Sequence, residues 1–373
     1  MRQLFFYLTL TCTLTVISVT NALELKAKAY YVAHPETDTV IFAHNENDLI
    51  GPASLTKMMT LYMLFDAIKD GDISLESMLP ISEKAWKKGG SKMFLEVGKT
   101  AKVEDLIQGI AVSSGNDACI VVAEFLGGTE DAFAEMMTEK ALDLGMKNTT
   151  FKNASGWPHP EQNTTAKDMY YLGKALFDNF PEHYHVFSQR DFQYSNIKQN
   201  NRNGLLNSGI GVDGIKTGHI DSSGYHLVAS AERGDARLVS AVLGTSSMKA
   251  RENETAKALS LVFAQYDVFD ILKTSKILEE NVAIWQGTEQ LVNLVPQKDM
   301  TLYIPKKDYK KLSVKITYKE PLIAPIQKGD TIGMAVIKTP QNTWEVPLTT
   351  TKDIAEAGIL NKFKQMIAYN LGF

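Results

Sequence analysis

Cysteine is scarce in this sequence, which holds only Cys12 and Cys119 in 373 residues. Cys12 lies in an N-terminal apolar run that we expect to be removed, so the mature chain would keep Cys119 alone and form no internal disulfide. Its stability must therefore come from burial of a core. Cys119 lies in the apolar stretch ACIVVAEFL, which favours a small buried core residue over a reactive thiol.

An excess of charge of one sign is also lacking, since 39 basic and 43 acidic residues leave a net charge of −4. No global basic field therefore points to nucleic acid. A phosphate-binding GxxxxGK[ST] loop is missing as well, because Met93 stands where the first glycine before the GKT at 98–100 should be. The seven histidines include no HExxH, and His183-x-His185 alone is a weak pattern, so no metal or other cofactor is predicted.

The N-terminal apolar run is too short for a typical membrane span. Met1-Arg2 gives a positive start, residues 4–19 carry no charge, and Thr20-Asn21-Ala22 offers a small residue for cleavage. This order is typical of a secretory signal peptide. We therefore predict that residues 1–22 are a cleaved signal, rather than an uncleaved anchor, and that the protein is exported.

Three further regions follow from the pattern of apolar residues. Two strand-like runs after the signal and three beyond Gly211 flank a block of helical patterns from Ser54 to about Phe187. This order predicts an α+β domain over residues 23–277, with an antiparallel sheet built from both ends of the segment and helices inserted between them. Short β-like runs separated by proline and glycine predict a small β-rich domain over residues 278–353.

The last region, residues 354–373, returns to helical spacing. Six apolar residues share one face of the predicted helix: Ile359, Leu360, Phe363, Met366, Ile367 and Leu371. Three polar or basic residues lie off that face: Lys362, Lys364 and Gln365. Such a helix either packs back on its own domain or lies on an anionic membrane surface. The spacing alone fits both.

A lysine at the head of an apolar helix is the first candidate for chemistry. Ser-x-x-Lys occurs three times in the chain, at 54–57, 195–198 and 246–249, so the pattern alone says little. Only Ser54 and Lys57 open a long apolar helix, in which positions i and i+3 share a face. Burial would lower the pKa of Lys57 and make its amine a general base for the Ser54 hydroxyl. The alternative is that Lys57 is a surface lysine whose amine reaches water and has no catalytic role.

Two other patterns occur once each. Ser114-Gly115-Asn116 is the chain's single Ser-x-Asn, and its alternative interpretation is a helix N-cap. Lys216-Thr217-Gly218 is the single Lys-Thr-Gly, and its alternative is an exposed edge strand with a solvated lysine. Together with Ser54 and Lys57, these residues provide a nucleophile, a base, a proton relay and an anion clamp for acyl transfer.

The trio of motifs is known from class A β-lactamases and penicillin-binding proteins. The chain resembles the low-molecular-mass penicillin-binding proteins that are D-alanyl-D-alanine carboxypeptidases of the DacA type. The resemblance runs nearly end to end, on segments that keep the family's order and spacing: PASLTKMMT, GGSKMFLEVG, SSGNDAC, TTAKDM, NRNGLL, VDGIKTGH and GYHLVASA. It implies the family's transpeptidase-like α+β domain followed by a β-rich domain and a membrane-associating tail.

The resemblance also implies a role for each motif residue. Ser54 would attack the carbonyl between the terminal D-alanines of a peptidoglycan stem peptide, while Lys57 takes its proton. The backbone N–H groups of Ser54 and His219 would form the oxyanion hole. Ser114 would relay a proton to the leaving D-alanine, and Asn116 would hold the substrate amide and Lys57.

The remaining implied contacts concern the substrate carboxylate. Lys216 would stabilise charge near Ser114, and Thr217 in the Lys-Thr-Gly motif that ends at Gly218 would bind the terminal carboxylate. Arg251 is the first candidate for a second carboxylate contact and Arg202 the next. β-Lactams would acylate the same serine, and the tail would hold the exported protein at the outer face of the cytoplasmic membrane.

Three other functions are compatible with parts of this pattern. A D,D-endopeptidase would use identical chemistry on crosslinks. A β-lactamase would need a water-activating glutamate, and the stretch 151–169 holds Glu161 but no such motif. A non-catalytic wall-binding protein would be expected to lose its costly buried lysine, which this chain keeps.

Overall fold

The computed structural model describes residues 23–370, and the predicted signal peptide lies outside that range. Contacts divide the described chain into a catalytic unit, Leu23–Val268, and a β-rich unit that starts at Phe269. The division falls nine residues before the boundary expected after residue 277. Strand β10, Tyr266–Leu272, pairs with β13, Met300–Pro305, and so joins the second unit.

The catalytic unit is built on one antiparallel sheet of five strands in the order β2-β1-β9-β8-β7. The first two strands come from the N-terminus and the other three from beyond residue 211, as the sequence predicted. Their bounds are Ala29–His34 for β1, Thr39–His44 for β2, Val212–Ile220 for β7, Gly224–Arg233 for β8 and Ala236–Thr245 for β9. Strand β7 is therefore an edge of this sheet.

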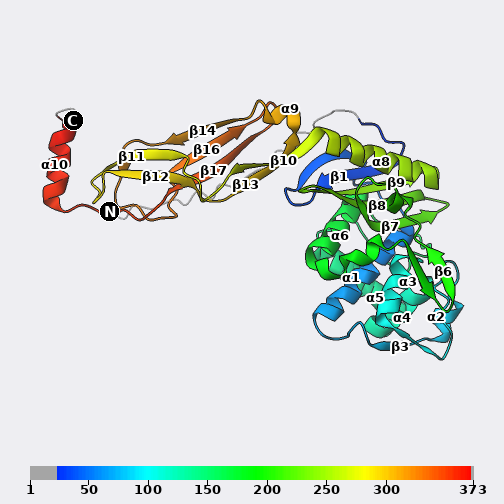
Figure 1. Ribbon diagram of the computed structural model, residues 1–373. Coiled ribbons are helices and arrows are strands. Elements are labelled where there is room, and N and C mark those ends of the chain that lie inside the picture. The colour runs from blue at the N-terminus through cyan, green and yellow to red at the C-terminus, as the bar shows by residue number, and fades with distance from the viewer. Residues whose placement is uncertain (1–22, 371–373) are drawn as a thin grey trace. The chain divides into compact units, whose positions relative to one another are not determined.

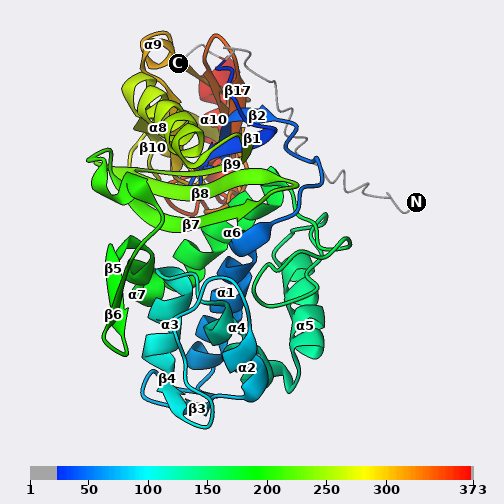
Figure 2. The same cartoon turned by 90° about the vertical axis from the view of Figure 1, so that its right-hand side faces the viewer.

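Helices cover both faces of the sheet (Figures 1 and 2). Helix α8, Met248–Gln265, lies on one face, and α6, Ala166–Asn179, lies on the other with the rest of the inserted block. Hydroxyl side chains start both helices: Ser247 accepts from the Ala250 N–H and Thr165 from the Asp168 N–H, which are typical N-caps. The predicted α+β architecture is confirmed.

The inserted block consists of several helices and two short hairpins. The helices are α1, Thr56–Lys69; α2, Glu83–Lys87; α3, Val103–Ala111; α4, Asn116–Gly127; α5, Glu130–Asp143; and α7, Pro181–Tyr184. The hairpins pair β3, Met78–Pro80, with β4, Thr100–Lys102, and β5, Asp191–Tyr194, with β6, Ile197–Asn200. Three 3₁₀ turns complete it: η1, Ala53–Leu55; η2, His185–Ser188; and η3, Gly204–Asn207.

Helix α1 is the central element of this block, in contact with α3, α4, α5 and α6. Its sequence is apolar on nearly every side, which is typical of a fully buried helix. Met58, Met59, Leu61, Leu64 and Phe65 are all 0% exposed. Because the whole helix is enclosed, Lys57 in its first turn is carried into the interior.

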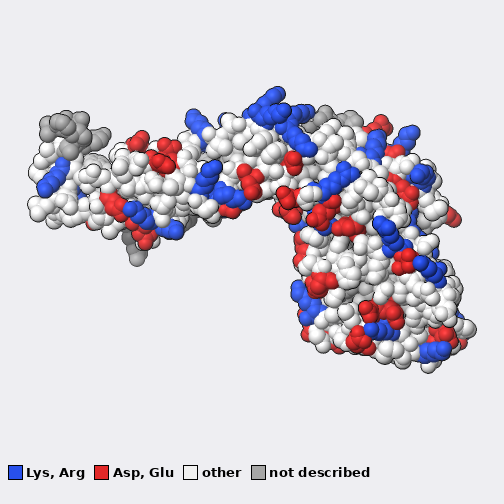
Figure 3. All heavy atoms as spheres, viewed as in Figure 1, with Lys and Arg blue, Asp and Glu red and all other residues white. Residues whose placement is uncertain are grey.

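The β-rich unit has a six-stranded sheet in the order β14-β16-β17-β12-β11-β15, together with the β10–β13 pair. Its remaining elements are β11, Glu279–Trp285; β12, Leu291–Pro296; α9, Lys306–Tyr309; β14, Ser313–Tyr318; β15, Leu322–Ile323; β16, Gly333–Lys338; and β17, Thr343–Thr350. Leu294, Ala335, Ile337 and Leu348 form its fully buried centre. Acidic and basic side chains are mixed on the visible surface, with lysines gathered over α9 (Figure 3).

A last helix, α10, covers Ile359–Asn370 within the predicted tail. Gln365 ties it to the β-rich unit, because its Oε1 accepts from the Gln286 N–H at 2.7 Å and its Nε2 donates to the Gly287 carbonyl at 3.1 Å. Four apolar side chains on its face stay uncovered: Ile359 is 86% exposed, Leu360 82%, Phe363 57% and Ile367 43%. Within residues 23–370, no helix has the length and apolarity to cross a bilayer.

One close backbone approach in the catalytic unit joins the turn before α1 to a distant loop. Gly156 has a φ of +82°, and a Cβ built on it would lie 1.8 Å from the carbonyl oxygen of Ala53 and 3.0 Å from the Ser54 nitrogen. These obstacles are backbone atoms rather than flexible side-chain ends. Only glycine allows the two segments to meet at this distance.

We therefore predict that Gly156→Ala destabilises the catalytic unit far more than Gly145→Ala. Gly145 has a nearly equal φ of +81°, but a Cβ added there would meet nothing within 4 Å, so its variant measures left-handed strain alone, about 1 to 2 kcal/mol. Gly156→Ala adds the displacement of η1 and should lower the free energy of unfolding by a further ~2 kcal/mol or more. Denaturant unfolding followed by helical circular dichroism gives both values, and equal losses would contradict the steric argument.

Candidate active site

Ser54 lies in the 3₁₀ turn η1, immediately before α1, and is partly exposed. The residue before it, Ala53, has a φ of +50°, an uncommon conformation for a residue with a side chain. The Lys57 Nζ lies 3.1 Å from the Ser54 Oγ and also donates to the Ser155 carbonyl. The predicted serine–lysine pair is thus formed at hydrogen-bonding distance.

The Lys57 amine is held in an environment that favours its neutral form. The side chain is fully buried, and burial lowers its pKa from 10.5 to about 8. The positive charges of Arg202 and Lys88 act in the same direction. A shift of this size corresponds to about 3 kcal/mol against the charged form. A neutral amine has a lone pair, so it can accept the Ser54 proton.

The Ser155 carbonyl that meets Lys57 belongs to a loop organised by Asn153. The Asn153 Oδ1 accepts from the N–H groups of Ser155, Gly156 and Trp157 at 3.2, 2.8 and 2.9 Å. Its Nδ2 donates to the Trp157 carbonyl at 2.8 Å. One buried amide therefore fixes the position of the carbonyl that orients the amine. Sequence reasoning missed this residue, because its partners become visible only in the folded loop.

Ser114 and Asn116 lie together at the start of α4. Ser114 is 1% exposed with a φ of +58°, and its Oγ has no hydrogen-bond partner within the described part of the chain. A buried hydroxyl without a partner is costly unless a ligand supplies one. The Asn116 Nδ2 donates to the Gly89 carbonyl at 2.8 Å. Neither side chain caps α4, so the N-cap interpretation is wrong.

Asp117 is a second residue that sequence reasoning missed. Its carboxylate accepts from the backbone N–H groups of Met93, Phe94, Leu95 and Ala118 at distances of 2.9 to 3.1 Å. The side chain is buried, and such bonds satisfy the charge inside the protein. It fastens the loop before Leu95 to the start of α4. The sequence feature that could have indicated Asp117 is its position at a helix N-terminus, directly after Ser-Gly-Asn.

The Lys-Thr-Gly motif lies in the middle of β7, where Lys216 is 3% and Thr217 5% exposed. The alternative interpretation, a solvated lysine on an exposed edge strand, is therefore wrong for Lys216, because η1 packs against this strand. A Cβ on Gly218 would lie 3.1 Å from the Pro52 carbonyl oxygen and 3.3 Å from the Ala53 Cβ. The glycine lets β7 and the Ser54 turn lie in direct contact.

Lys216 is also shifted toward its neutral form. Burial lowers its pKa well below the ordinary value, and the positive charges of Lys57, Arg202 and Arg251 lower it further. Its amine donates to the Thr217 carbonyl at 3.4 Å. Four cationic groups thus act on one another in this part of the unit, which is an arrangement suited to an anionic ligand.

The two arginine candidates differ in their surroundings. Arg251 is 3% exposed on α8, where its guanidinium donates to the Arg202 carbonyl at 3.1 Å and lies 3.6 Å from Glu252, while its Nε has no hydrogen-bond partner in the described chain. The Arg202 side chain is exposed. Arg251 therefore fixes the segment that carries Arg202.

His219 follows the motif on β7, but its ring is turned outward. The ring stacks on Tyr225 at 3.9 Å, its Nε2 lies 3.6 Å from the Asp221 carboxylate, and 39% of the side chain is exposed. The buried histidine nearby is His226, the register partner of Gly218 on β8. Sequence reasoning did not single it out.

His226 takes part in a chain of hydrogen bonds that ends beside the Ser54 turn. Its Nδ1 accepts from the Gly244 N–H at 2.9 Å, so Nε2 carries the proton and donates to the Ser223 Oγ at 2.8 Å. Ser223 in turn donates to the Gly51 carbonyl at 3.1 Å. Burial lowers the pKa of His226 to about 3, so the ring stays neutral and holds the segment before Pro52.

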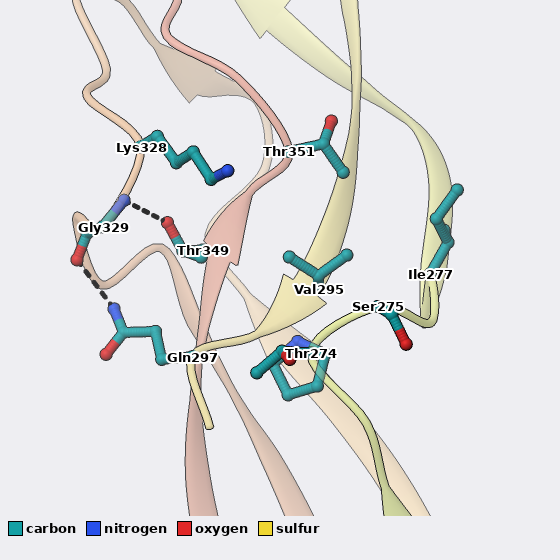
Figure 4. Close-up of a pocket in the computed structure, with 10 residues that line it drawn as sticks. Thr274, Ser275, Ile277, Val295, Gln297, Lys328, Gly329, Thr349 and Thr351 are labelled. Carbon is teal, nitrogen blue, oxygen red and sulfur yellow. Dashed lines mark hydrogen bonds between the residues drawn. The ribbon is translucent and has the colours of Figure 1, made fainter. Parts of the chain in front are cut away.

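The β-rich unit has a cavity of about 850 Å³ that is separate from these residues. Hydroxyl groups, Gln297 and Lys328 line it, and Gly329 is bonded there to both Thr349 and Gln297 (Figure 4). None of the predicted site residues is among those that line it. The predicted site residues therefore all belong to the catalytic unit, which holds the Ser54 hydroxyl with the Lys57 amine bonded to it, the buried Ser114 hydroxyl and the cations of Lys216, Arg202 and Arg251. This set of groups can carry out acyl transfer.

Comparisons with known proteins agree with that chemistry. The family model described as D-alanyl-D-alanine carboxypeptidase matches residues 16–247, and that described as penicillin-binding protein 5, C-terminal domain, matches residues 266–356. The chain is 36% identical over 348 residues to the D-alanyl-D-alanine carboxypeptidase DacA of Escherichia coli K12, covering 91% of this chain and 86% of that one.

Two solved structures share the fold, one over most of the chain and one over about two thirds of it. Penicillin-binding protein 5 from Haemophilus influenzae has a TM-score of 0.78 at 36% identity, covering 89% of this chain and 98% of that one. Penicillin-binding protein D2 from Listeria monocytogenes, solved in its ampicillin-bound form, has a TM-score of 0.57 at 29% identity, covering 65% of this chain and 99% of that one. On its site, its fold and these matches, the chain belongs to the D-alanyl-D-alanine carboxypeptidase family of penicillin-binding proteins.

Proposed function

We propose that this protein is a serine carboxypeptidase that removes the terminal D-alanine from peptidoglycan stem pentapeptides through an acyl-enzyme. One observation carries the proposal: the fully buried Lys57 amine, with a pKa lowered to about 8, lies 3.1 Å from the Ser54 hydroxyl. An amine in that state accepts a proton near neutral pH. The family match supplies the class of substrate.

The first half of the reaction transfers the acyl group to Ser54. Lys57 accepts the hydroxyl proton while the Ser54 oxygen adds to the carbonyl carbon of the bond between the two D-alanines. The backbone N–H groups of Ser54 and His219 donate to the oxygen that becomes negative. The carbon–nitrogen bond then breaks as Ser114 passes its proton to the leaving amine and takes the proton that Lys57 accepted. The products are free D-alanine and an ester on Ser54.

The second half hydrolyses that ester. Lys57 takes a proton from water as the water oxygen adds to the ester carbonyl. It returns that proton to the Ser54 oxygen as the carbon–oxygen bond breaks, and the shortened stem peptide is released with a new carboxylate. Lys57 and Ser114 return to their starting protonation states. No cofactor takes part in this scheme.

Substrate contacts follow from the cations and amides around Ser54. Asn116 holds the substrate amide, and its buried position beside Gly89 fixes that amide group. Thr217 binds the terminal carboxylate, and Lys216 stabilises charge near Ser114. Arg202 completes the carboxylate contacts on the segment that Arg251 holds. Gly218 contributes by allowing β7 to lie against the Ser54 turn.

β-Lactams acylate the same serine, since their strained amide presents a carbonyl and a carboxylate in a similar arrangement. A rapid β-lactamase is disfavoured by the position of Glu161. Its carboxylate lies 2.8 Å from the Lys152 amine, and 67% of its side chain is exposed. A carboxylate turned to solvent and paired with a lysine is poorly placed to activate water at Ser54.

The protein is exported and acts at the outer face of the cytoplasmic membrane, with α10 as its attachment. Two observations support this part of the proposal. The side chains of Ile359, Leu360, Phe363 and Ile367 on α10 are exposed rather than packed on the β-rich unit. Lys364 provides positive charge next to them, as in helices that lie on anionic membrane surfaces, while Lys362 is paired with Glu356.

We predict that Ser54→Ala abolishes acylation by penicillin while the fold survives, because the variant removes only the attacking oxygen. The measurement is the mass of the intact protein after mixing with penicillin, followed by D-alanine release from a D-Ala-D-Ala peptide. Ser246→Ala, in another Ser-x-x-Lys match, is the control and should retain the adduct. An undiminished adduct in Ser54→Ala would refute the assignment of the nucleophile, and release from crosslinked dimers alone would favour an endopeptidase.

The rate of acylation should rise with pH through about 8. Only the neutral Lys57 amine accepts a proton, and its pKa of about 8 leaves most of it charged below pH 7. The second-order rate constant for penicillin should therefore increase about tenfold from pH 6 to 7 and level off above about 9. Lys57→Arg, which stays charged throughout, should show neither the rate nor the rise. A flat profile in the wild type between pH 6 and 9 would exclude this base.

Replacing two exposed residues of α10, in the variant Leu360→Glu with Phe363→Glu, should move the protein from the membrane fraction to the soluble fraction at low salt. The change removes apolar area and adds negative charge, so attraction to an anionic surface is lost. Val314→Glu alters another exposed apolar residue of the same unit, on β14, and should leave the distribution unchanged. A wild type that is already soluble at low salt would refute the attachment.

A further inference from the structure

Trp157 is a large exposed side chain held on a rigid loop beside the site. The residue is 45% exposed. Asn153 bonds both its N–H and its carbonyl, and the Gln162 Nε2 donates to the same carbonyl at 3.1 Å. An aromatic ring that stays exposed on fixed backbone is a typical contact surface for a ligand.

The ring lies at the border of the proposed substrate-binding groups. A Cβ built on Gly90 would lie 3.0 Å from the Trp157 Cζ3 and 2.7 Å from the Asn116 Nδ2, so the ring and the amide meet across this glycine. The residue before Trp157 is Gly156, which approaches the Ser54 nitrogen. Asn116 is the group that we assign to the substrate amide. The ring therefore borders the side of the site that receives the acyl part of the substrate.

A cation accompanies the ring. The Lys88 Nζ lies 5.7 Å from the centre of the Trp157 ring. It is 3.4 Å from the Glu130 carboxylate, which also pairs with Lys84 at 3.2 Å. Because Glu130 is buried and shared between two lysines, one positive charge in this group stays uncompensated.

We propose that Trp157 and Lys88 form a subsite for the residue that precedes the two D-alanines of the stem peptide. The inference rests on the proposed function and names the substrate more closely. The aliphatic part of that residue's side chain lies on the indole ring, and a carboxylate at its end pairs with Lys88. The subsite selects a diamino acid whose side chain carries a carboxylate over lysine, whose side chain ends in an ammonium group alone.

Three acetylated peptides that end in D-Ala-D-Ala test the subsite. Their first residue is meso-diaminopimelate, L-lysine or L-alanine, and kcat/KM is measured from D-alanine release by the full chain. The variants are Trp157→Ala and Lys88→Gln. Trp86→Ala is the matched control, because Trp86 is a similarly exposed tryptophan, 43% on α2, and is not part of the proposed subsite. Titration with labelled penicillin counts the folded sites in each preparation.

Lys88→Gln should lower the preference for the diaminopimelyl over the lysyl peptide about fivefold, as expected for one exposed ion pair. Trp157→Ala should lower the preference for both long side chains over alanine about tenfold, since it removes their apolar contact. Trp86→Ala should leave both ratios within about twofold.

Two results would overturn the subsite. One is that both ratios stay unchanged in Trp157→Ala and Lys88→Gln. The other is that Trp157→Ala slows all three peptides equally, which would mean that the ring only supports its loop. Failure of the proposed function is a different result, because the wild type would then release D-alanine from none of the peptides.

Discussion

The burial of the Lys57 amine without a carboxylate partner is the constraint on which the rest of the site depends. Enclosing the charged form costs about 3 kcal/mol, given the lowering of its pKa to about 8. A carboxylate would offset that cost and keep the amine charged, and such an amine could not take a proton from Ser54. Instead the amine meets a hydroxyl and the carbonyl of Ser155. The surrounding helices supply the apolar enclosure, and their packing offsets the cost.

Close backbone contact is the second requirement, since the Lys57 amine meets the carbonyl of Ser155, which lies far away in the sequence. Glycine provides the contact at two places, where Gly156 meets Ala53 and Gly218 meets Pro52. Uncommon backbone conformations lie next to both hydroxyl groups, at Ala53 before Ser54 and at Ser114 itself. Strain of this kind persists only where the surrounding structure holds it. Here two glycine contacts and the Asp117 carboxylate hold it, so the stability of the core maintains the geometry of the site.

The sequence predicted the α+β fold, the β-rich unit and the serine–lysine pair, because each leaves a local pattern. It did not predict Asn153, Asp117 or His226, whose roles depend on partners that only folding brings near. Of these three residues, only Asp117 had a recognisable feature in the sequence, its position at a helix N-terminus. The contacts divide the chain nine residues before the expected boundary after 277, because β10 pairs with β13 and neither strand's own sequence indicates that pairing. The exposure of the α10 face likewise needed the fold, because an apolar stripe does not say what covers it.

Asn153 connects the chemistry of the site to the choice of substrate. Its Oδ1 fixes Ser155, whose carbonyl orients the Lys57 amine, and also fixes Trp157 two residues later. A substrate side chain that packs on the ring therefore bears on the same short loop that positions the base. Binding energy from a group remote from the scissile bond can then favour the productive position of the amine, which is how remote contacts raise turnover as well as affinity. A change at Trp157 should for this reason affect kcat as well as KM.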